Sequence, residues 1–316
     1  MTKLIPEQSA QEQAAAARQV EDQAFVTSAE ITMLTNGWPP YRGQVVGPER
    51  VRAWLDQVPQ NRDRRILFKL LQRLRFVAEK DIREKLNLAH RAVRMQTSAY
   101  TPKSRAERRY DLVVTYTDGE GKSGQYYASK YAEENLISTQ CVIGCADFAR
   151  RIQDLEKERG PLTGIIVVDD VVATGQSLQA NLRSFLEANP VITEKGIPIV
   201  VVVLFATASG ERYLRNVMIA EMGANVDLRV CEYIDDDLHA FGPDAGAWAS
   251  ETEAERARGL VMELGAKIYK KQPMGYGDLG LLLVFPQTVP NNALPILHSL
   301  GKGPDGWKPL FPRPVN

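Results

Sequence analysis

The sequence predicts an α/β protein whose core is a parallel β-sheet. From residue 111 onward, short apolar runs rich in Val and Ile alternate with helical stretches, which is the pattern of βαβ units. Two of these runs are apolar throughout, as expected for strands that are buried on both faces. Before residue 98 the apolar residues repeat at spacings of three and four, which predicts helices. We therefore divide the chain into a helical region over 1–97, an α/β core over 98–235 and a C-terminal region over 236–316.

The first region is expected to hold four helices. A polar stretch rich in Ala and Gln over 1–30 predicts an amphipathic helix, and Pro48 opens a second helix because proline is tolerated in a first turn. Further apolar repeats predict helices over 66–74 and 82–89, the last of them after a break at 79–81. All of residues 1–97 are thus expected to be helix and connector.

The core and the C-terminal region follow in order. Runs of β-branched and other apolar residues predict the strands, and amphipathic spacing predicts the helices between them. The predicted core strands are 111–117, 137–143, 164–168, 197–205 and 226–233. The predicted core helices are 125–135, 148–158, 177–188 and 211–222. The C-terminal region is expected to contain a charged helix over 247–271 and a strand over 280–285.

The composition excludes several classes of protein. Hydrophobic residues make up 44% of the chain, which is enough for a folded core. The longest apolar run, Ile197 to Ala206, is far shorter than the ~18 residues that span a bilayer, and residues 1–13 lack an apolar leader. We therefore expect a cytoplasmic protein that does not enter a membrane. The three histidines have no zinc-ligand spacing, which argues against a histidine-based zinc site.

The net charge of zero conceals a basic segment over 50–110. This segment holds 17 Lys and Arg against 6 Asp and Glu, whereas the rest of the chain holds 22 against 33. Such an excess suggests an anionic partner: a nucleic acid, a protein, or the acidic part of a second copy in a homodimer. A solvated helical face is the simpler interpretation, and the sequence leaves both open.

One stretch carries recognisable chemistry. The predicted strand Gly164–Val168 ends in Asp169 and Asp170, and small and hydroxyl residues then lead into a helix. Side chains at the carboxyl end of a parallel strand enter the crevice where α/β sheets bind ligands. Two carboxylates there can accept hydrogen bonds from sugar hydroxyls or hold Mg²⁺. The turn at a helix N-terminus suits a phosphate, because its backbone amides are accessible. The turn residues are Ala173, Thr174, Gly175, Gln176 and Ser177.

This stretch resembles the phosphoribosyl pyrophosphate (PRPP) signature of the type I phosphoribosyltransferases. The signature is a strand of four apolar residues, two acids, three mostly apolar residues and Thr-Gly. The resemblance implies a phosphoribosyltransferase-type, Rossmann-like core that binds PRPP or a related nucleotide with Mg²⁺. It implies that Asp169 and Asp170 contact the ribose and the metal ion, and that residues 173–177 hold the 5′-phosphate. In an active enzyme of this family, transfer or cleavage would occur at the ribose C1 carbon.

A second loop, over 118–124, follows the first core strand and precedes a helix. The type I enzymes grip pyrophosphate there through backbone amides and often a lysine, so the resemblance gives this role to Gly121, Lys122, Ser123 and Gly124. The alternative is a P-loop NTPase, because Gly-Lys-Ser also occurs in Walker A motifs. A Walker A motif requires glycine where this chain has Tyr116, so we consider that alternative weaker.

The span over 136–164 differs from many of these enzymes. It offers one plausible strand and no room for the long catalytic flap that excludes water from the reaction. Ligand binding does not require that flap, but transfer chemistry does benefit from it. The chain is therefore expected to be either a transferase or a non-catalytic module that senses nucleotides or acts on a partner.

The C-terminal region is the expected hood over the sheet, where type I enzymes select the base. The helical front, the GKSG loop, the DD-x3-TG signature and the YGD and PNN-x-LP tail resemble bacterial phosphoribosyltransferase-like proteins. Some of these occur in anti-phage defence loci, including retron cassettes. Aromatic and polar side chains of the tail could stack on a base and hydrogen-bond to it. The candidates are Tyr276, Asp278, Phe285, Asn291 and Asn292.

Overall fold

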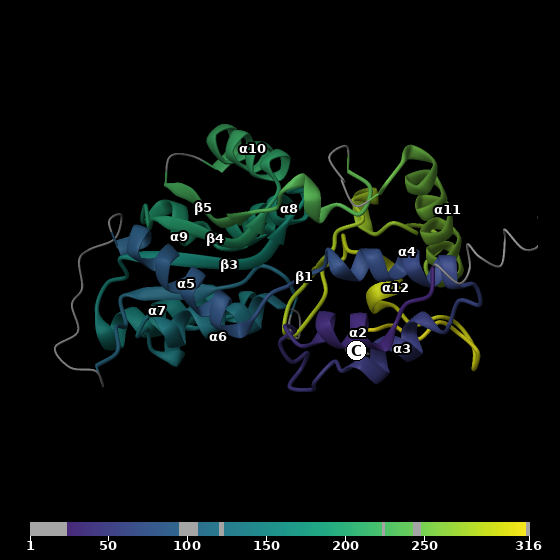
Figure 1. Cartoon of the computed structure of the whole chain (residues 1–316). Helices are drawn as coiled ribbons and strands as arrows, with labels where there is room; N and C mark the ends of the chain where they lie inside the picture. Colours follow the sequence, from purple (N-terminus) through teal and green to yellow (C-terminus); the bar gives the residue numbers. More distant parts are fainter. Residues whose placement is uncertain (1–23, 95–106, 120–122, 223–224, 243–247, 314–316) are drawn as a thin grey trace, which may run out of the picture. The chain divides into compact units, whose positions relative to one another are not determined.

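The computed structural model describes residues 24–94, 107–119, 123–222, 225–242 and 248–313 (Figure 1). The chain forms two compact units. The sheet unit comprises Glu79–Asp235, and the terminal unit comprises Met1–Ala78 together with Asp236–Asn316. Helix α5 (Glu79–Arg94) belongs to the sheet unit because it packs on α6, β4 and β5, whereas the sequence placed 1–97 in a helical region.

The sheet unit contains a parallel sheet of four strands in the order β2-β3-β4-β5. All eight residues of β4 and the first five of β3 are buried, which agrees with the absence of polar side chains from these stretches. The α/β class with a parallel sheet is thus confirmed. The strands are β2 (Leu112–Thr115), β3 (Gly164–Val172), β4 (Ile199–Ala206) and β5 (Val226–Tyr233).

Helices cover both faces of this sheet. Helices α5 and α6 pack together against the strands on one face, and α8 and α10 pack together on the opposite face (Figure 1). Helix α7 joins the second group through the rings of Phe148 and Phe185, whose centroids lie 4.8 Å apart. These helices are α6 (Ser123–Glu134), α7 (Phe148–Arg159), α8 (Gln176–Ala188), α9 (Pro190–Glu194) and α10 (Ala208–Val217), which is followed by a π-helical turn at Met218–Met222.

The strand expected over 137–143 is replaced by a 3₁₀ turn, η1 (Thr139–Cys141). The Ser138 side chain accepts the amide of Gln140 and so begins the turn. Isolated bridges flank it, from Ile137 to Arg109 and from Val142 to Val114. The segment therefore lies along β2, but it is not a strand because a hydroxyl group competes with the ladder for the backbone amides.

The terminal unit combines helices from both ends of the chain with a small parallel sheet. The strand β1 (Arg75–Phe76) pairs with β6 (Leu283–Val284), which departs from the all-helical expectation for 1–97. A cluster of edge-on aromatic rings, Trp38, Tyr41, Phe76 and Phe311, fills the core beside it. The helices are α2 (Ser28–Thr35), α3 (Pro48–Leu55), α4 (Asn61–Gln72), α11 (Glu251–Ile268) and α12 (Pro295–His298).

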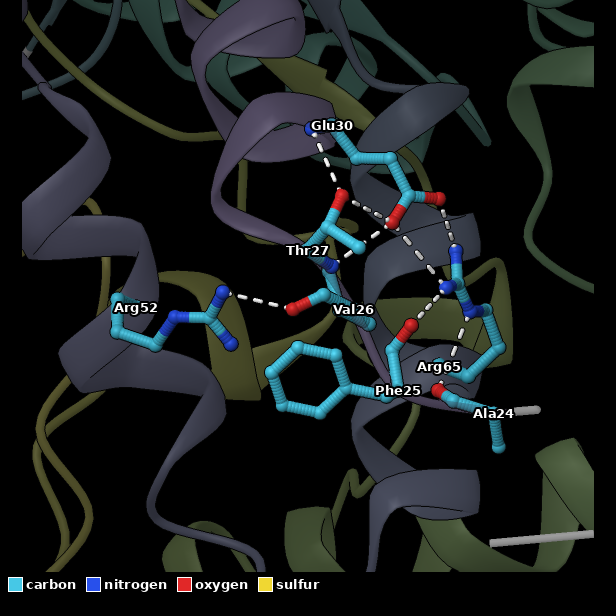
Figure 2. Close-up of polar contacts among 7 residues, drawn as sticks. All are labelled: Ala24, Phe25, Val26, Thr27, Glu30, Arg52 and Arg65. Atoms are coloured by element: carbon cyan, nitrogen blue, oxygen red, sulfur yellow. Dashed lines mark hydrogen bonds and ion pairs between the residues drawn. The ribbon is translucent and has the colours of Figure 1, made fainter. Parts of the chain in front are cut away.

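Two arginines anchor the start of the described chain (Figure 2). The Arg65 guanidinium donates to the Ala24 and Phe25 carbonyl oxygens and to both carboxylate oxygens of Glu30, at 2.6 and 3.2 Å for the latter. Arg52 donates to the Val26 carbonyl at 2.7 Å. Residues 1–23, which include most of the helix expected over 1–30, lie outside the described chain. Within the described ranges, no helix is both long and apolar enough to cross a bilayer.

Candidate functional site

The two acids of the signature lie on β3 itself, near its carboxyl end. The strand was expected to end at Val168, but it continues to Val172 because Asp169 pairs with Val203 and Val171 with Phe205 of β4. On the other side, the pairing with β2 runs only to Val167. The acids therefore lie at the carboxyl edge of the sheet, beyond the end of β2, where α/β sheets bind ligands.

Both carboxylates are fixed by the backbone that follows them. The amide of Asp170 donates to Asp169 Oδ1 and the amide of Val171 donates to Asp170 Oδ1, each at 2.8 Å. Burial raises the pKa of Asp169 well above its usual range, and the charges of Asp170 and Asp118 raise it further. The site thus gathers negative charge in a half-buried place, which favours a cation or hydroxyl donors as ligands.

The turn after β3 leads directly into helix α8. Gly175 is the N-cap residue of this helix and has a left-handed backbone with φ 80°. A Cβ atom at Gly175 would lie 2.8 Å from Tyr213 Cδ1 and 3.0 Å from the Gly210 carbonyl oxygen, so glycine is required there for conformation and for space. Gln176 and Ser177 are exposed in the first turn of α8. The first amides of a helix have no acceptor within it, so this turn offers donors to an anion.

The residue that caps helix α10 holds the turn after β3 in place. The Thr207 hydroxyl caps α10 by accepting the Gly210 amide at 3.0 Å, and it also donates to the Ala173 carbonyl oxygen. A Cβ atom at Gly210 would overlap that same carbonyl oxygen. Sequence reasoning missed Thr207 and Gly210, although a threonine between a buried strand and a helix is a typical capping signal.

The second loop meets the same edge of the sheet. Ser123 and Gly124 open α6, and the Gly124 amide donates to Asp118 Oδ2 at 3.1 Å. Gly121 and Lys122 lie outside the described chain, so their predicted contact with pyrophosphate stays a prediction. Asp118 lies close enough to Asp169 to raise its pKa. The charge of Asp118 thus acts on Asp169, an interaction that the sequence did not suggest.

The model of the PRTase-CE family matches residues 51–313, which is most of the chain and includes parts of both units. The chain belongs to the PRTase-CE family. It is therefore a phosphoribosyltransferase-like protein, which favours the PRPP-signature interpretation over the P-loop alternative.

The chain can also be compared with curated proteins and with solved structures. No curated protein matches the chain. A solved structure, "Structure of AQ2163 protein from Aquifex aeolicus", is similar at 12% identity and covers 58% of this chain and 82% of its own. Its TM-score is 0.25, so it carries no argument about the fold or the function.

This PRTase-CE chain is compact where a catalytic flap would be found. Residues 123–164 are all described, and they contain helices α6 and α7, two 3₁₀ turns and isolated bridges but no pair of strands. The Thr115 hydroxyl donates to the Ile143 carbonyl at 2.7 Å and holds this span against β2. The expectation that this protein lacks a long catalytic flap stays a prediction.

The five predicted base-binding residues belong to the terminal unit, and three of them are in contact. The Tyr276 amide donates to the Asn291 carbonyl, and the Asn292 side chain donates to the Tyr276 carbonyl, both at 2.9 Å. Tyr276 and Asp278 are exposed. Phe285 is fully buried, so its ring is a core residue in this structure. A role of these five residues in base binding stays a prediction.

The basic segment over 50–110 is divided between the two units. Many of its described cations are paired with anions within their own unit. These pairs are Arg64–Asp56, Arg65–Glu30, Lys69–Glu253, Arg83–Glu134, Lys85–Glu232 and Arg109–Asp111. Such pairing favours the interpretation as ordinary surface and structural charge. Binding of a nucleic acid, a protein or a second copy through this segment stays a prediction.

Asp169 and Asp170 are the residues of this site that could hold a divalent cation. No group of three metal-ligating side chains occurs among the residues that the structure describes. Mg²⁺ usually takes one or two carboxylates together with substrate phosphates and water. Asp169 and Asp170, at the edge of the sheet and with their charges close together, supply that partial set of ligands.

Proposed function

We propose that this protein binds PRPP, or a related ribose 5-phosphate nucleotide, at the carboxyl edge of β3. The observation that carries the proposal is the turn over 173–175, which joins two carboxylates on β3 to the open N-terminus of α8. A ribose 5-phosphate presents hydroxyl donors and an anionic phosphate a short distance apart. The acids match the hydroxyls and the helix N-terminus matches the phosphate.

Each group of residues then has a stated role. Asp169 and Asp170 accept hydrogen bonds from the ribose hydroxyls. The backbone amides over 173–177 donate to the 5′-phosphate, and the loop over 121–124, including the Lys122 ammonium, binds the pyrophosphate. The family membership supports this set of roles, because it makes the chain phosphoribosyltransferase-like.

We infer that Mg²⁺ accompanies the ligand. Asp169 and Asp170 would hold it together with ligand oxygens, and the ion would neutralise pyrophosphate charge. Burial, followed by the charges of Asp170 and Asp118, raises the Asp169 pKa. A cation would relieve the repulsion between these carboxylates, which supports the inference. The chain's own part is to fix the ribose and its phosphate in one orientation.

If the protein is a transferase, the bond from ribose C1 to the pyrophosphate oxygen breaks and a bond from C1 to an acceptor nitrogen forms. Pyrophosphate leaves with the bonding electron pair, and the acceptor's proton passes to water. The positive charge that develops on the ribose ring would be stabilised by the nearby carboxylates. Release of pyrophosphate, followed by ³¹P NMR while purine and pyrimidine bases are added singly, tests this step.

We propose as a second candidate a non-catalytic nucleotide sensor or effector module of an anti-phage defence system. The compact span over 123–164 supports the non-catalytic part of this candidate. A site without a closing flap leaves its ligand accessible to water, which suits reversible sensing better than group transfer. In this case PRPP binds without turnover. Phage challenge of cells that carry the native locus, with wild type compared with the Asp169→Asn/Asp170→Asn variant, tests the defence role.

Calorimetry with PRPP and Mg²⁺ is the experiment that tests the binding proposal. We expect wild type to bind and the Asp169→Asn/Asp170→Asn variant to lose at least 10-fold in affinity. The matched control is Asp147→Asn/Asp154→Asn, which removes two exposed carboxylates of the same unit that pair with Arg150 and Lys157 nearby. The control should bind within about 2-fold of wild type. A folded wild type that does not bind PRPP would overturn the proposal.

A further inference from the structure

The side chain of Tyr213 reaches from α10 to α8. Its hydroxyl donates to Gln179 Oε1 at 2.9 Å, and the two helices pack together. Gln179 lies one turn into α8, where its amide donates to the Gly175 carbonyl oxygen at 2.9 Å. This backbone bond is the first of the helix, since Gly175 is the N-cap residue. The Tyr213 hydroxyl is therefore bonded to the residue that closes the first turn of α8.

The ring of Tyr213 lies against the other end of that turn. A Cβ atom at Gly175 would lie 2.8 Å from Tyr213 Cδ1, which is closer than ordinary van der Waals contact. The ring and the hydroxyl thus contact two residues of α8 that are four positions apart. A single side chain of α10 therefore fixes both ends of the first turn of α8.

The residues between these two contact points are open to solvent. Gln176 and Ser177 are exposed, whereas Tyr213 and Gln179 are half-buried. The amides at the start of a helix have no acceptor within it. The contacts with α10 therefore hold this turn and still leave Gln176 and Ser177 accessible to a ligand.

Helix α10 is itself fixed against the turn that follows β3. Leu214, the neighbour of Tyr213, is fully buried, and its Cγ lies 3.0 Å from the Cβ position at Gly175. The Thr207 cap of α10 also donates to the Ala173 carbonyl oxygen. A support of this kind sets the direction of the first amides of α8 relative to the acid pair, and a ligand that spans both groups requires such a fixed geometry.

We propose that Tyr213 is a positioning residue for the 5′-phosphate of the bound ribose phosphate. Its ring on Gly175 and its hydroxyl on Gln179 hold the first amides of α8 in the direction in which they donate to that phosphate. This inference rests on the proposed function, because it takes the turn over 173–177 as the phosphate site. Tyr213 acts through α8, and its loss leaves the groups that bind the rest of the ligand in place.

A merely structural contact between two helices would behave differently. Its loss would lower the stability of the sheet unit, but a ligand that still bound would meet the same groups as before. PRPP gives separate ³¹P resonances for its 5′-phosphate and for the two phosphates of its pyrophosphate. The 5′-phosphate resonance of bound PRPP therefore reports on the first turn of α8 separately from the rest of the site. A positioning role predicts that this resonance alone changes when Tyr213 is replaced.

Three variants remove the support in steps. Tyr213→Phe keeps the ring and loses the hydroxyl, and Gln179→Met removes the acceptor at a similar side-chain length. Each should weaken PRPP about 3-fold, and the double variant should be no weaker than either, because both changes remove the same hydrogen bond. Tyr213→Ala removes the ring as well and should weaken PRPP at least about 10-fold.

The matched control is Tyr233→Phe. It removes a tyrosine hydrogen bond of 2.8 Å to the same helix, but the acceptor is Glu211 of α10 instead of a residue of α8. We expect this control to bind PRPP within about 2-fold of wild type and to keep all ³¹P resonances of the bound ligand, because the first turn of α8 keeps its support. A loss in the control as large as that of Tyr213→Phe would assign the effect to a general loosening of α10 and overturn the inference.

Calorimetry and ³¹P NMR at saturating PRPP and Mg²⁺ on these variants test the inference. In Tyr213→Ala the 5′-phosphate resonance should return at least halfway to its free position, while the pyrophosphate resonances keep their bound positions. Tyr213→Phe, which keeps the packing of the ring, should show a smaller change of the same resonance. The inference fails if both variants bind PRPP as wild type does, if every resonance or none of them changes, or if the losses of Tyr213→Phe and Gln179→Met add in the double variant.

The test separates this inference from the proposed function. Each of the failures above leaves the proposed function intact when wild type binds PRPP and Asp169→Asn/Asp170→Asn loses that binding. A folded wild type that does not bind PRPP, and so shows only the resonances of the free ligand, overturns both proposals.

Discussion

The Thr207 hydroxyl donates to the Ala173 carbonyl oxygen at 2.5 Å and so joins the end of β4 to the turn that follows β3. The same hydroxyl accepts the Gly210 amide, and Thr207 is buried. One side chain therefore fixes the start of α10 and the predicted phosphate-binding turn together. The geometry of that turn depends on a residue 34 positions further along the chain.

Replacement of Thr207 by valine tests this dependence. Valine keeps the branched shape but leaves the buried Ala173 carbonyl and Gly210 amide without their partner, which costs about 1–3 kcal/mol. We expect PRPP affinity to fall several-fold and the sheet unit to lose stability, as measured by calorimetry and by amide hydrogen exchange. Thr207→Ser keeps the hydroxyl and should restore both. Equal affinities for Thr207→Val and wild type would show that the turn does not need this support.

Gly175 should tolerate no side chain. Alanine there combines a left-handed backbone, with φ 80°, and contact with the Tyr213 ring and the Gly210 carbonyl. We expect Gly175→Ala to lose about 2 kcal/mol or more and to abolish phosphate binding. Gly160→Ala is the control, because Gly160 also has positive φ, at 94°, but no atom lies within 4 Å of its Cβ position. That control should cost about 1–3 kcal/mol, because its ψ of −178° places it in a region nearly confined to glycine, and it should leave ligand affinity unchanged.

The sequence could propose those parts of the candidate site that are contiguous in the chain. The acids on β3 and the turn over 173–177 follow one another, so strand pattern and turn composition were enough to propose them as candidates. Asp118 and Thr207 come from the two neighbouring βα units, and their contacts depend on strand order and register. Neither is visible in a single sequence, although both precede a helix and carry an oxygen acceptor suited to a cap.

The fold, too, could be predicted where the signal lies within one stretch of sequence and not where it depends on distant residues. The buried strands β3 and β4 were predicted because apolar runs of that length leave few alternatives. The pairing of Arg75–Phe76 with Leu283–Val284 was not, since two-residue strands have no periodicity and their partner lies more than 200 residues away. The segment 137–143 has the composition of a strand, but the Ser138 hydroxyl captures a backbone amide and turns the chain.

His298 should make the terminal unit sensitive to acid. Its ring is buried, and burial lowers its pKa from 6.5 to about 3. Between these values the unfolded chain binds a proton that the folded chain does not, so stability falls as the pH falls from about 6.5 towards 3. In the middle of this window the loss approaches about 1.4 kcal/mol for each pH unit.

Unfolding followed by tryptophan fluorescence measures this effect on the terminal unit alone, because all four tryptophans lie in that unit. We expect wild type to lose stability between pH 6.5 and pH 4.5. His298→Asn, whose amide can replace the ring nitrogen that contacts the Ser299 hydroxyl at 2.9 Å, should be less stable at pH 7 but show a smaller pH dependence. An unchanged pH dependence in the variant would assign the acid sensitivity to other groups.

Arg65 should determine both the order of the segment over 24–30 and the ionisation of Glu30. Its hydrogen bond to Glu30 is the largest cause that lowers the pKa of this carboxyl from 4.5 to about 2. This contribution to stability is present above pH 4.5 and is lost as the pH falls towards 2. The Glu30 side chain is 36% exposed, so solvent screening keeps the energy small.

The Arg65→Lys variant keeps the positive charge but loses the planar guanidinium group with its several donors. An ammonium group cannot reach two carbonyls and a carboxylate at once, so the variant tests whether the charge alone is sufficient. We expect the amides over 24–30 to exchange at least 10-fold faster, while the Glu30 pKa, measured by NMR titration, rises part of the way towards 4.5. Arg62→Lys, at an exposed position of the same helix, should change neither quantity. If Arg65→Lys kept both the slow exchange and the low pKa, the anchor would depend on charge alone, and the fork of the guanidinium would have no special role.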